Sequence, residues 1–419
     1  ADFAVGVVGA VGTSAAELAE ARGLPSQDVA VDRRHAVMSF NDGMYHYMNG
    51  VVILGGEIMV PVNGFYEAKD GKWMCFNGAY PHLRDGILKY FDAPHDQDAL
   101  ISQVAKHDSA KIEADFAKMG LCMAPLNTHE EWLAHPQGQA MSELPIVTME
   151  KFGDAKQRVL PEAKHRPLEG VRVIDVTHVV AGPWATRVMA DHGADVISIR
   201  NPAFPFLYPM IFSESYGKKQ ILLHLGMEKS KARFTELLKD ADVLVWGYAP
   251  GSLERLGFTR EALMALNPNL VVTRVSAYGP EGPWAKRKGW EQLAQACSGM
   301  VDLASRGREQ HHLVGALPND YATGYLAAIG AVETALWDIA GQVAGLPLYA
   351  LLGGQRAADM PLYHSITCIA PDEMARIAGE AQAQGISQFQ VKLGASGDWQ
   401  TDVERLARVR EAVGPGPLV

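Results

Sequence analysis

Short β-branched runs alternate with helical stretches between residues 171 and 275, and this rhythm constrains the fold more than any other feature. The expected strands are Val171–Asp175, Asp195–Ile199, Val243–Trp246 and Leu270–Val275, with helices around 184–192 and 231–238. Such alternation predicts βαβ units and a parallel sheet. Because the strands are apolar on both faces, helices are expected to cover both sides of the sheet. The predicted class is α/β, with a Rossmann-like, doubly wound parallel sheet.

The loops at the carboxyl ends of these strands are where a site is expected, because open α/β sheets bind ligands there. They follow Asp175, Trp246 and Ser276. Ala181-Gly-Pro183 also opens a helix, so its backbone N–H groups could meet a phosphate or carbonyl oxygen. The alternative is a tight connector in which Gly and Pro only turn the chain.

The first 165 residues have a different pattern, which predicts a smaller α+β domain. Asp70-Gly71 stands between the apolar runs Phe65–Glu67 and Trp73–Phe76, and this arrangement is a strong hairpin signal. The other expected elements are helices over 81–90 and 98–118 and a helix opened by the capping-box pair Thr128 and Glu131.

Composition narrows the function classes. The net charge is −10 with both signs spread along the chain, so no basic face is expected for nucleic acid or an anionic membrane. No apolar run approaches the roughly 18 residues of a membrane helix, and the first residues lack the pattern of a secretion signal. The four cysteines form no CxxC pair, which disfavours a zinc site or a disulfide framework. A cytoplasmic protein without nucleic-acid, membrane or metal partners is expected.

An internal repeat is a further feature. Asp2–Gly12 aligns without gaps on Asp320–Gly330, with Asp, Ala, Gly, Ala and Gly matched and an aromatic residue on an aromatic residue. The repeat predicts that the chain opens inside one copy of a module and reaches the same point of a second copy near Gly330.

Many ordered motifs between residues 168 and 320 carry a resemblance to the family III CoA transferases, the CaiB/BaiF family. They are Leu168–Pro183, His192–Ile199, Gly217–Lys219, Pro250–Gly257, Asn267-Pro268, Ser276–Pro280 and Gly289–Gly299, followed by Asp320. Residues 1–165 resemble the smaller half of the same family through the Asp70-Gly71 hairpin and Glu131–Gln137. The resemblance over 1–330 implies two halves in tandem, a small-domain-like half (1–165) before a Rossmann-like half (166–330).

This resemblance implies transfer of CoA between carboxylic acids, with acyl-CoA and small acids as partners. Asp320 stands where the family's aspartate attacks an acyl-CoA thioester to give a mixed anhydride, and the CoA thiolate can then return to form an enzyme-bound thioester. Asp2 is its counterpart in the repeat and the second candidate. The alternative role of Asp320 is to N-cap a helix over Tyr321–Leu336, and both roles can hold at once. The family's interlocked dimers imply a homodimer.

The resemblance also implies residues that contact CoA. Those of the loop before the first helix are Val179, Val180, Ala181 and Gly182, and the candidates for the CoA phosphates are Lys218, Lys219 and Arg255. For the lysine pair, a solvated turn is the alternative.

Several positions depart from the family pattern. Val180 stands where glutamine is usual, Trp246-Gly247 replaces an acid-Asn pair, and Arg200-Asn201 replaces an acid-Arg pair. These changes remove polar contacts to CoA or to the anhydride. Trp290 and Glu291 stand where racemases of the superfamily place histidine and aspartate, which disfavours two-base racemisation.

Residues 331–419 resemble a fragment of the enolase superfamily near the mandelate racemase group. The segments that carry this resemblance are Ala335–Gly354, Met360–Ser365 and Phe389–Gly394. They imply the end of a capping domain and the first strands of an incomplete (β/α) barrel, since a whole barrel needs roughly 200 residues or more. Lys392 matches the family's α-proton base, while a water-facing lysine is the alternative. Mg²⁺ is expected only if the barrel were complete.

Three functions therefore remain open at this point. The leading hypothesis is a CoA transferase, and the alternatives are an enolase-superfamily racemase or dehydratase fragment and a non-catalytic CoA-binding module.

Overall fold

The computed structural model describes most of the chain, in two compact units. The described residues are 1–52, 62–151, 163–204, 208–344, 363–366, 368–383, 385–386, 388–394 and 399–414. The units are Ala1–Leu348 and Tyr349–Val419.

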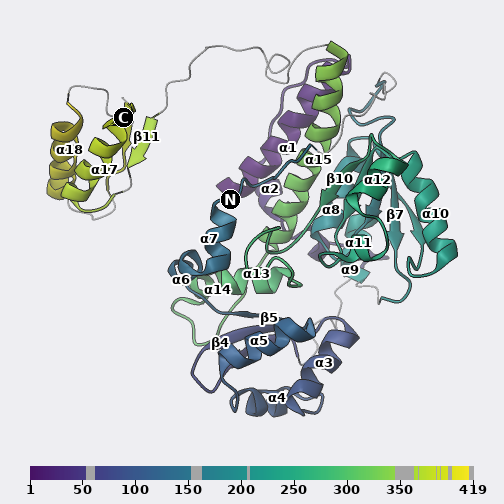
Figure 1. Cartoon of the computed structure of the whole chain (residues 1–419), viewed down its shortest axis with the longest axis horizontal. Helices are drawn as coiled ribbons and strands as arrows, with labels where there is room; N and C mark the ends of the chain where they lie inside the picture. The colour runs from purple at the N-terminus through teal and green to yellow at the C-terminus, as the bar shows by residue number, and fades with distance from the viewer. Residues whose placement is uncertain are drawn as a thin grey trace. The chain divides into compact units, whose positions relative to one another are not determined.

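A sheet of five parallel strands organises the first unit (Figure 1). Its strands, in spatial order, are β10 (Val271–Arg274), β9 (Val243–Trp246), β6 (Arg172–Val176), β7 (Asp195–Arg200) and β8 (Lys218–Leu222). The predicted parallel sheet is confirmed. The chain order reverses between β6 and β9, and sheets of this kind bind ligands beyond the carboxyl ends at that switch point.

The strand β8 is missing from the sequence prediction. Three of its five residues, Lys-Lys-Gln-Ile-Leu, are polar, and it lies at the edge of the sheet with much of its surface exposed. Edge strands often carry charged residues that discourage pairing with other chains. The strand therefore lacks the buried apolar run by which the other four are recognised.

Helices cover both faces of the sheet. Val173 and Val243 face one apolar cluster, and Ile174 and Leu244 face another on the opposite side. The helices of the first cluster are α8 (Ala181–Asp191), α15 (Pro318–Ala344) and α1 (Asp2–Ala21). Those of the second are α10 (Glu228–Lys239), α11 (Ser252–Arg255) and α12 (Arg260–Leu266). Alternate residues of each strand therefore enter different cores, which explains why the strands are apolar throughout.

The two helices that contain the sequence repeat, α1 and α15, lie side by side (Figure 1). Val7 and Val11 of α1 belong to the same buried cluster as Ala328 and Ala331 of α15. By length and composition, α1 is apolar enough to cross a membrane, so the expectation that no segment reaches this limit was wrong. The core helix of a soluble protein passes the same test, and the finding is weak evidence for a membrane span.

The first unit also contains a three-stranded antiparallel sheet. Its strands are β3 (Gly64–Glu67), β4 (Trp73–Asn77) and β5 (Cys122–Pro125). The predicted hairpin is confirmed, because Glu67 pairs with Trp73 across the Asp70-Gly71 turn. The predicted capping box is also present, with Thr128 and Glu131 exchanging hydrogen bonds at the start of α6 (His129–Ala134).

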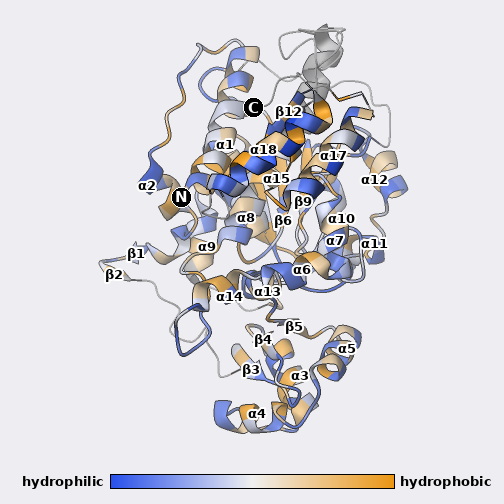
Figure 2. Cartoon of the chain, turned by 90° about the vertical axis from the view of Figure 1, so that its left-hand side faces the viewer, coloured by the Kyte–Doolittle hydropathy of each residue, from blue (hydrophilic) through white to orange (hydrophobic). Residues whose placement is uncertain are grey.

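The helix expected over 98–118 is two helices, so that prediction was wrong. The helices packed on this sheet are α3 (Pro81–Phe91), α4 (Gln97–Val104) and α5 (Ser109–Met119). The break is fixed by the hairpin: the carbonyl of His107 accepts a hydrogen bond from the Lys69 N–H, and the Ser109 hydroxyl donates to Asp70. Figure 2 shows hydrophobic and hydrophilic stretches alternating along these helices.

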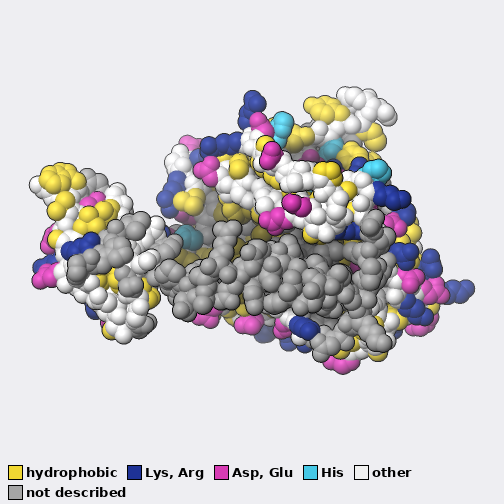
Figure 3. Space-filling model, turned by 90° about the horizontal axis from the view of Figure 1, so that it is seen from above, with side chains coloured by type: hydrophobic (Ala, Val, Ile, Leu, Met, Phe, Trp, Pro, Cys, Tyr) yellow, Lys and Arg dark blue, Asp and Glu magenta, His cyan; other side chains and the backbone are white. Residues whose placement is uncertain are grey.

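Short elements complete the first unit. They are α2 (Arg33–Ser39), η1 (Asp42–Met44), β1 (Tyr47–Met48), β2 (Val51–Val52), α7 (Pro136–Ser142), α9 (Tyr208–Ser215), α13 (Glu291–Cys297) and α14 (Met300–Ser305). Figure 3 shows Lys and Arg side chains interspersed with Asp and Glu on the described part of one face. Neither sign of charge gathers on that part of the surface.

The second unit alternates strand and helix. Its elements are β11 (Tyr363–Ile366), α17 (Pro371–Ala383), β12 (Gln388–Val391) and α18 (Trp399–Val413). The strands pair in parallel, and Ile366, Met374 and Phe389 lie in its small core. The incomplete barrel and the enolase-superfamily resemblance stay predictions, and residues 345–362 of the matching sequence lie outside the described residues.

The helix α15 is continuous from Pro318 to Ala344. The predicted boundary near residue 330 therefore falls inside a helix. The assignment of 1–165, 166–330 and 331–419 to three domains stays a prediction.

Candidate functional site

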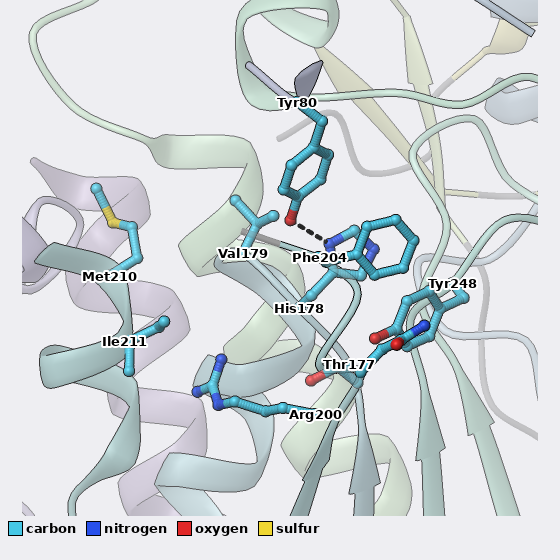
Figure 4. A pocket seen from close by; sticks show the side chains of 10 residues that line it. Tyr80, Thr177, His178, Val179, Arg200, Phe204, Met210, Ile211 and Tyr248 are labelled. Carbon is cyan, nitrogen blue, oxygen red and sulfur yellow. Dashed lines mark hydrogen bonds between the residues drawn. The ribbon is translucent and has the colours of Figure 1, made fainter. Parts of the chain in front are cut away.

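A pocket lies at the switch point of the parallel sheet (Figure 4). The pocket is small and partly open to solvent. Its lining includes Tyr80, Thr177, His178, Arg200, Phe204 and Tyr248. Thr177 and His178 follow β6, Arg200 ends β7, and Tyr248 follows β9. The pocket thus lies where sheet topology predicts a ligand.

The loop between β6 and α8 approaches its neighbours closely. Val179 has a φ of +72°, a left-handed conformation that is unusual for a β-branched residue. A Cβ atom on Gly182 would lie 2.5 Å from the Thr177 Cβ, so a glycine is required there. The helix starts at Ala181, and its N-cap, Val180, makes no side-chain capping hydrogen bond. The contacts of residues 179–182 with CoA stay a prediction.

His178 stands among aromatic side chains at the pocket. Its Nδ1 lies 3.0 Å from the Tyr80 hydroxyl, and its ring is nearly parallel to that of Phe204. Burial lowers the pKa of His178 to about 4, and the nearby Arg200 contributes to this shift. The ring is therefore neutral at neutral pH. Tyr80, at the start of α3, brings the antiparallel region to the pocket, and no local sequence signal points to this contact.

A buried ion pair lies beneath the loop. The Lys218 Nζ is 3.1 Å from the Asp175 carboxylate, and both side chains are almost completely buried. The same ammonium group donates to the Pro183 carbonyl and to the Thr186 hydroxyl, each at 2.7 Å. Thr186 and Thr177 donate hydrogen bonds to the Asp175 carboxylate. The cluster joins β6, α8 and β8.

The other predicted phosphate contacts lie on the surface. Lys219 is near the amino end of β8 and forms an exposed ion pair with Asp195, the first residue of β7. It therefore lies at the edge of the sheet opposite the pocket. Arg255 is exposed in α11, which follows β9 on the pocket side. Of Lys218, Lys219 and Arg255, only Arg255 is both exposed and at the edge of the sheet where the pocket lies.

Arg200 and Glu214 are buried charged residues that sequence reasoning did not place in a site. Arg200 is 7% exposed, and its Nε and Nη2 have no hydrogen-bond partner in the described part of the chain. Glu214 on α9 is 1% exposed, and the same holds for both of its carboxyl oxygens. Burial raises the pKa of Glu214 well above its ordinary value, although Lys218 and Arg200 oppose the shift.

Asp320 lies in the first turn of α15, which begins at Pro318. It is the third residue of the helix, so the N-cap position predicted for it was wrong. Its backbone N–H donates to the Glu291 carboxylate at 2.6 Å, and Asn319 and Gln295 also donate to Glu291. Burial raises the pKa of the Asp320 carboxyl well above its ordinary value, and Glu291 raises it further.

Asp320 is held close to the predicted CoA loop by helix packing. A Cβ atom on Gly324, one turn after Asp320, would lie 2.7 Å from the Ala181 carbonyl oxygen. The Tyr321 ring packs edge-on against Trp184 of α8, with ring centroids 4.7 Å apart. Asp320 raises the pKa of Glu214 and Arg200 lowers it, so both charged groups lie near Glu214. The structure therefore gathers Asp320, the loop after β6 and the pocket in one region.

The remaining sequence candidates are not gathered there. The Asp2 side chain is 89% exposed at the start of α1 and forms an ion pair with Arg33 at 2.9 Å. Lys392 is exposed after β12 in the second unit. No group of three or more His, Cys, Asp and Glu residues that could hold a metal ion occurs among the described residues.

Comparison with known proteins gives this geometry a context. Residues 168–344 match the model of CoA-transferase family III. A formyl-CoA:oxalate CoA-transferase of Bradyrhizobium sp. (strain ORS 278) is 37% identical over 186 residues, which are 41% of this chain and 43% of that protein. The alpha subunit of a succinyl-CoA–L-malate CoA-transferase of Chloroflexus aurantiacus is 34% identical over 210 residues, 46% of this chain and 47% of that one.

Among solved structures, a CAIB/BAIF family protein from Brucella suis is 25% identical, with a TM-score of 0.38 over 45% of this chain and 55% of that one. The chain spans about half the length of the curated relatives it matches. The similarity to the family model extends over residues 168–344, which is less than half of the 419-residue chain.

Proposed function

We propose that this protein transfers CoA between carboxylic acids through a covalent intermediate on Asp320. One observation carries the proposal: within the segment that matches the family, α15 carries the Asp320 carboxyl, whose pKa burial raises, and packs closely at Gly324 against Ala181, the first residue of α8. Acyl-CoA and small acids are then the substrates. The cytoplasmic location expected from the sequence is part of the same proposal.

The proposed reaction begins with the ionised Asp320. Its oxygen attacks the thioester carbonyl, the C–S bond breaks, and a mixed anhydride and CoA thiolate result. The thiolate then attacks the aspartyl carbonyl and releases the first acid, which leaves CoA bound to Asp320 as a thioester. The acceptor acid attacks this thioester, CoA leaves as thiolate and attacks the acyl carbonyl of the new anhydride. The products are the acceptor's CoA ester and free Asp320.

Glu291 has a supporting role in this proposal. Two neighbouring carboxyl groups that are partly removed from water do not readily both carry a full charge. The Glu291 carboxylate accepts hydrogen bonds from Gln295, Asn319 and the Asp320 N–H, which favour its ionised form, and its charge raises the pKa of the Asp320 carboxyl. Partial removal of water from the Asp320 carboxylate makes it a stronger nucleophile than a fully solvated one. The hydrogen bond from the Asp320 backbone N–H holds the Glu291 carboxylate next to the first turn of α15.

The CoA contacts follow from the loop geometry. The backbone at Val179–Gly182 is proposed to meet CoA oxygen atoms at the amino end of α8. Val180 has no polar side-chain group to offer, so the contact there is made by backbone. We propose that Lys218 holds α8 and β6 together through Asp175 instead of binding phosphate, because its ammonium group already contacts three protein oxygens. Arg255 remains the candidate for a phosphate contact.

Chemical trapping tests the proposal. The full chain is incubated with succinyl-CoA, or with acetyl-CoA, in the presence of hydroxylamine, and the peptides are analysed by mass spectrometry. An aspartyl hydroxamate at Asp320 is expected, with Asp320→Asn abolishing it and Asp2→Asn leaving it intact. CoA binding without any hydroxamate would overturn the proposal and favour the non-catalytic CoA-binding module.

A further inference from the structure

The side chain of Tyr321, the residue after Asp320, is held from several sides. Its ring packs edge-on against Trp184 of α8, with centroids 4.7 Å apart, and its centroid lies 6.5 Å from that of Phe40. Its hydroxyl oxygen accepts a hydrogen bond from the Gly43 backbone N–H at 2.9 Å. Tyr321 is 1% exposed. The ring and the hydroxyl group are therefore fixed by α8 and by the segment that follows α2.

A polar junction sets the direction of the Gly43 N–H. The Asp42 carboxylate accepts a hydrogen bond from the Ser213 hydroxyl at 2.6 Å and lies 3.0 Å from the His46 Nε2. The Ser213 carbonyl in turn accepts a hydrogen bond from the Arg187 side chain of α8 at 2.6 Å. We call Asp42, Gly43, His46 and Ser213 the Asp42 junction. It ties η1 to α9 and α8, so residues outside α15 fix the partner of the Tyr321 hydroxyl.

The backbone at the start of α15 is held by the same segment. The Leu317 N–H donates to the Phe40 carbonyl at 2.9 Å, and the Leu317 carbonyl accepts from the Tyr321 N–H at 3.1 Å. On the other side, the Asp320 N–H donates to the Glu291 carboxylate. The first turn of a helix has no internal partners for its N–H groups, and helix ends open more readily than helix interiors. These contacts oppose such opening at the turn that carries Asp320.

The hydroxyl of Tyr321 can therefore influence Asp320 without touching a substrate. Successive side chains of an α-helix point about 100° apart, so a rotation of the first turn moves both residues by the same angle. A long side chain anchored at its far end opposes that rotation. Misplacement of a reacting group by about 1 Å can cost about a hundredfold in rate. The contact with Gly43 thus acts on the direction of the Asp320 carboxyl group.

The sequence repeat contains a natural comparison. Phe3 of α1 stands at the position that corresponds to Tyr321, and it is 61% exposed and has no hydroxyl group. Its neighbour Asp2 forms a surface ion pair with Arg33. Of the two copies, the one with the desolvated aspartate is the one with the anchored hydroxyl group.

We propose that Tyr321 is a positioning residue for CoA transfer: its hydroxyl group, held by the Asp42 junction, fixes the direction in which the Asp320 carboxylate meets the thioester. The inference rests on the proposed function, because it concerns the same reaction of Asp320. It gives residues 42–46, which lie outside the segment that matches the family, a part in that reaction.

The test follows the formation of the aspartyl hydroxamate at Asp320 over time. The full chain reacts with hydroxylamine and either succinyl-CoA or acetyl-CoA, whichever labels Asp320 faster. The rate constant at saturating acyl-CoA and the half-saturating concentration are measured separately. Tyr321→Phe removes the hydroxyl and keeps the ring, so the rate constant is expected to fall at least about tenfold. The half-saturating concentration is expected to change less than about twofold, because Tyr321 does not contact CoA in this proposal.

Tyr325 offers a matched control for loss of packing or folding. It lies one turn later on α15, and its ring is near the same two aromatic side chains, 5.6 Å from Trp184 and 5.9 Å from Phe40 between centroids. Tyr325→Phe is expected to keep the rate constant of the unchanged chain. Urea denaturation of both variants is expected to show that both remain folded under the conditions of the reaction.

A double-variant cycle tests the role of the Asp42 junction. Asp42→Asn weakens its charge-assisted hydrogen bonds and is expected to slow hydroxamate formation at least about threefold in the unchanged chain. In Tyr321→Phe the same substitution is expected to add no further loss, because two residues that act through one contact are not additive.

Several results would overturn the inference and leave the proposed function standing. They are a rate constant of Tyr321→Phe within about twofold of the unchanged chain, a change confined to the half-saturating concentration, an equal loss in Tyr325→Phe, and additive effects in the cycle. No hydroxamate in the unchanged chain with either acyl-CoA would overturn both the inference and the proposed function.

Discussion

The helices α1 and α15 begin with the same residue pattern, yet their aspartates meet opposite surroundings. Asp2 is exposed and pairs with Arg33, whereas Asp320 is desolvated and receives a pKa shift from Glu291. Both helices contribute to one apolar cluster, so burial of the helix itself does not make the difference. The difference comes from α13 and α8, which pack on the first turn of α15. The same motif therefore gives an aspartate with a raised pKa only where neighbouring helices remove it from water.

The same contrast holds for matched glycines of the repeat. A Cβ atom on Gly324 of α15 would lie 2.7 Å from the Ala181 carbonyl oxygen, whereas one on Gly6 of α1 would meet nothing within 4 Å. Gly324 permits close packing of α15 against the start of α8, whereas Gly6 lies at no close contact. Four predictions test this comparison.

The largest expected effect concerns the position of the carboxyl group. Asp320→Glu keeps the charge but moves the carboxyl by one methylene group, and misplacement by about 1 Å can cost about a hundredfold in rate. We expect kcat/KM for CoA transfer to fall by at least about a hundredfold. Asp2→Glu, with its exposed side chain, is the matched control and is expected to leave the rate unchanged. Activity of Asp320→Glu close to that of the unchanged chain would exclude Asp320 as the reacting group.

The second prediction exchanges the matched glycines. Gly324→Ala is expected to destabilise the fold by about 1–3 kcal/mol, because the added methyl group overpacks the contact with α8. Gly6→Ala is expected to stabilise it by up to about 1 kcal/mol, because alanine favours a helix where space is free. Urea denaturation monitored by circular dichroism measures both free energies of unfolding. Equal effects would show that α1 and α15 are packed alike.

The third prediction concerns the dependence of stability on pH. The pKa of Asp320 is raised in the folded state, so the folded chain binds more protons than the unfolded chain above the ordinary value of about 4. This residue therefore lowers the free energy of unfolding as the pH rises through that window. Asp320→Asn cannot ionise and is expected to gain stability over the unchanged chain between pH 4 and pH 7, as measured by urea denaturation at each pH. A difference that stays constant or shrinks would contradict the burial assigned to Asp320.

The smallest expected effect is a shift of a pH profile. Glu291→Gln removes a carboxyl group that raises the pKa of Asp320, so the acid limb of kcat/KM is expected to move to lower pH. Glu309→Gln, an exposed substitution, is the control and is expected to keep the original profile. An unchanged pH profile in Glu291→Gln would show that Glu291 does not affect the ionisation of Asp320.

Much of the fold could be predicted from local sequence patterns. The apolar runs of β6, β7, β9 and β10 indicate the parallel sheet, and the Asp70-Gly71 turn and the capping box before α6 follow from short-range chemistry. The edge strand β8 was missed because three of its five residues are polar. The break between α4 and α5 was missed because it depends on hydrogen bonds from a distant hairpin.

The candidate site was predictable in part. The motif order pointed to Asp320 and the loop after β6, and the carboxyl ends of the strands indicated where a ligand would lie. The contribution of Tyr80 depends on how the antiparallel region packs, so no local pattern announces it. Lys218 resembles a surface lysine in the sequence, yet its side chain is buried against Asp175. Glu214 could not be placed because α9 was not predicted.

The conformation of Val179 has a consequence for variant libraries. Its left-handed backbone stores strain of about 1–3 kcal/mol, which glycine would relieve. Selection for thermal resistance alone should therefore enrich glycine at position 179. Selection for turnover should retain valine if the side chain, which packs against both the parallel-sheet core and the cluster around Tyr80, holds the loop in register. A deep mutational scan with both selections would show whether the strained backbone at Val179 only lowers stability or is also needed for turnover.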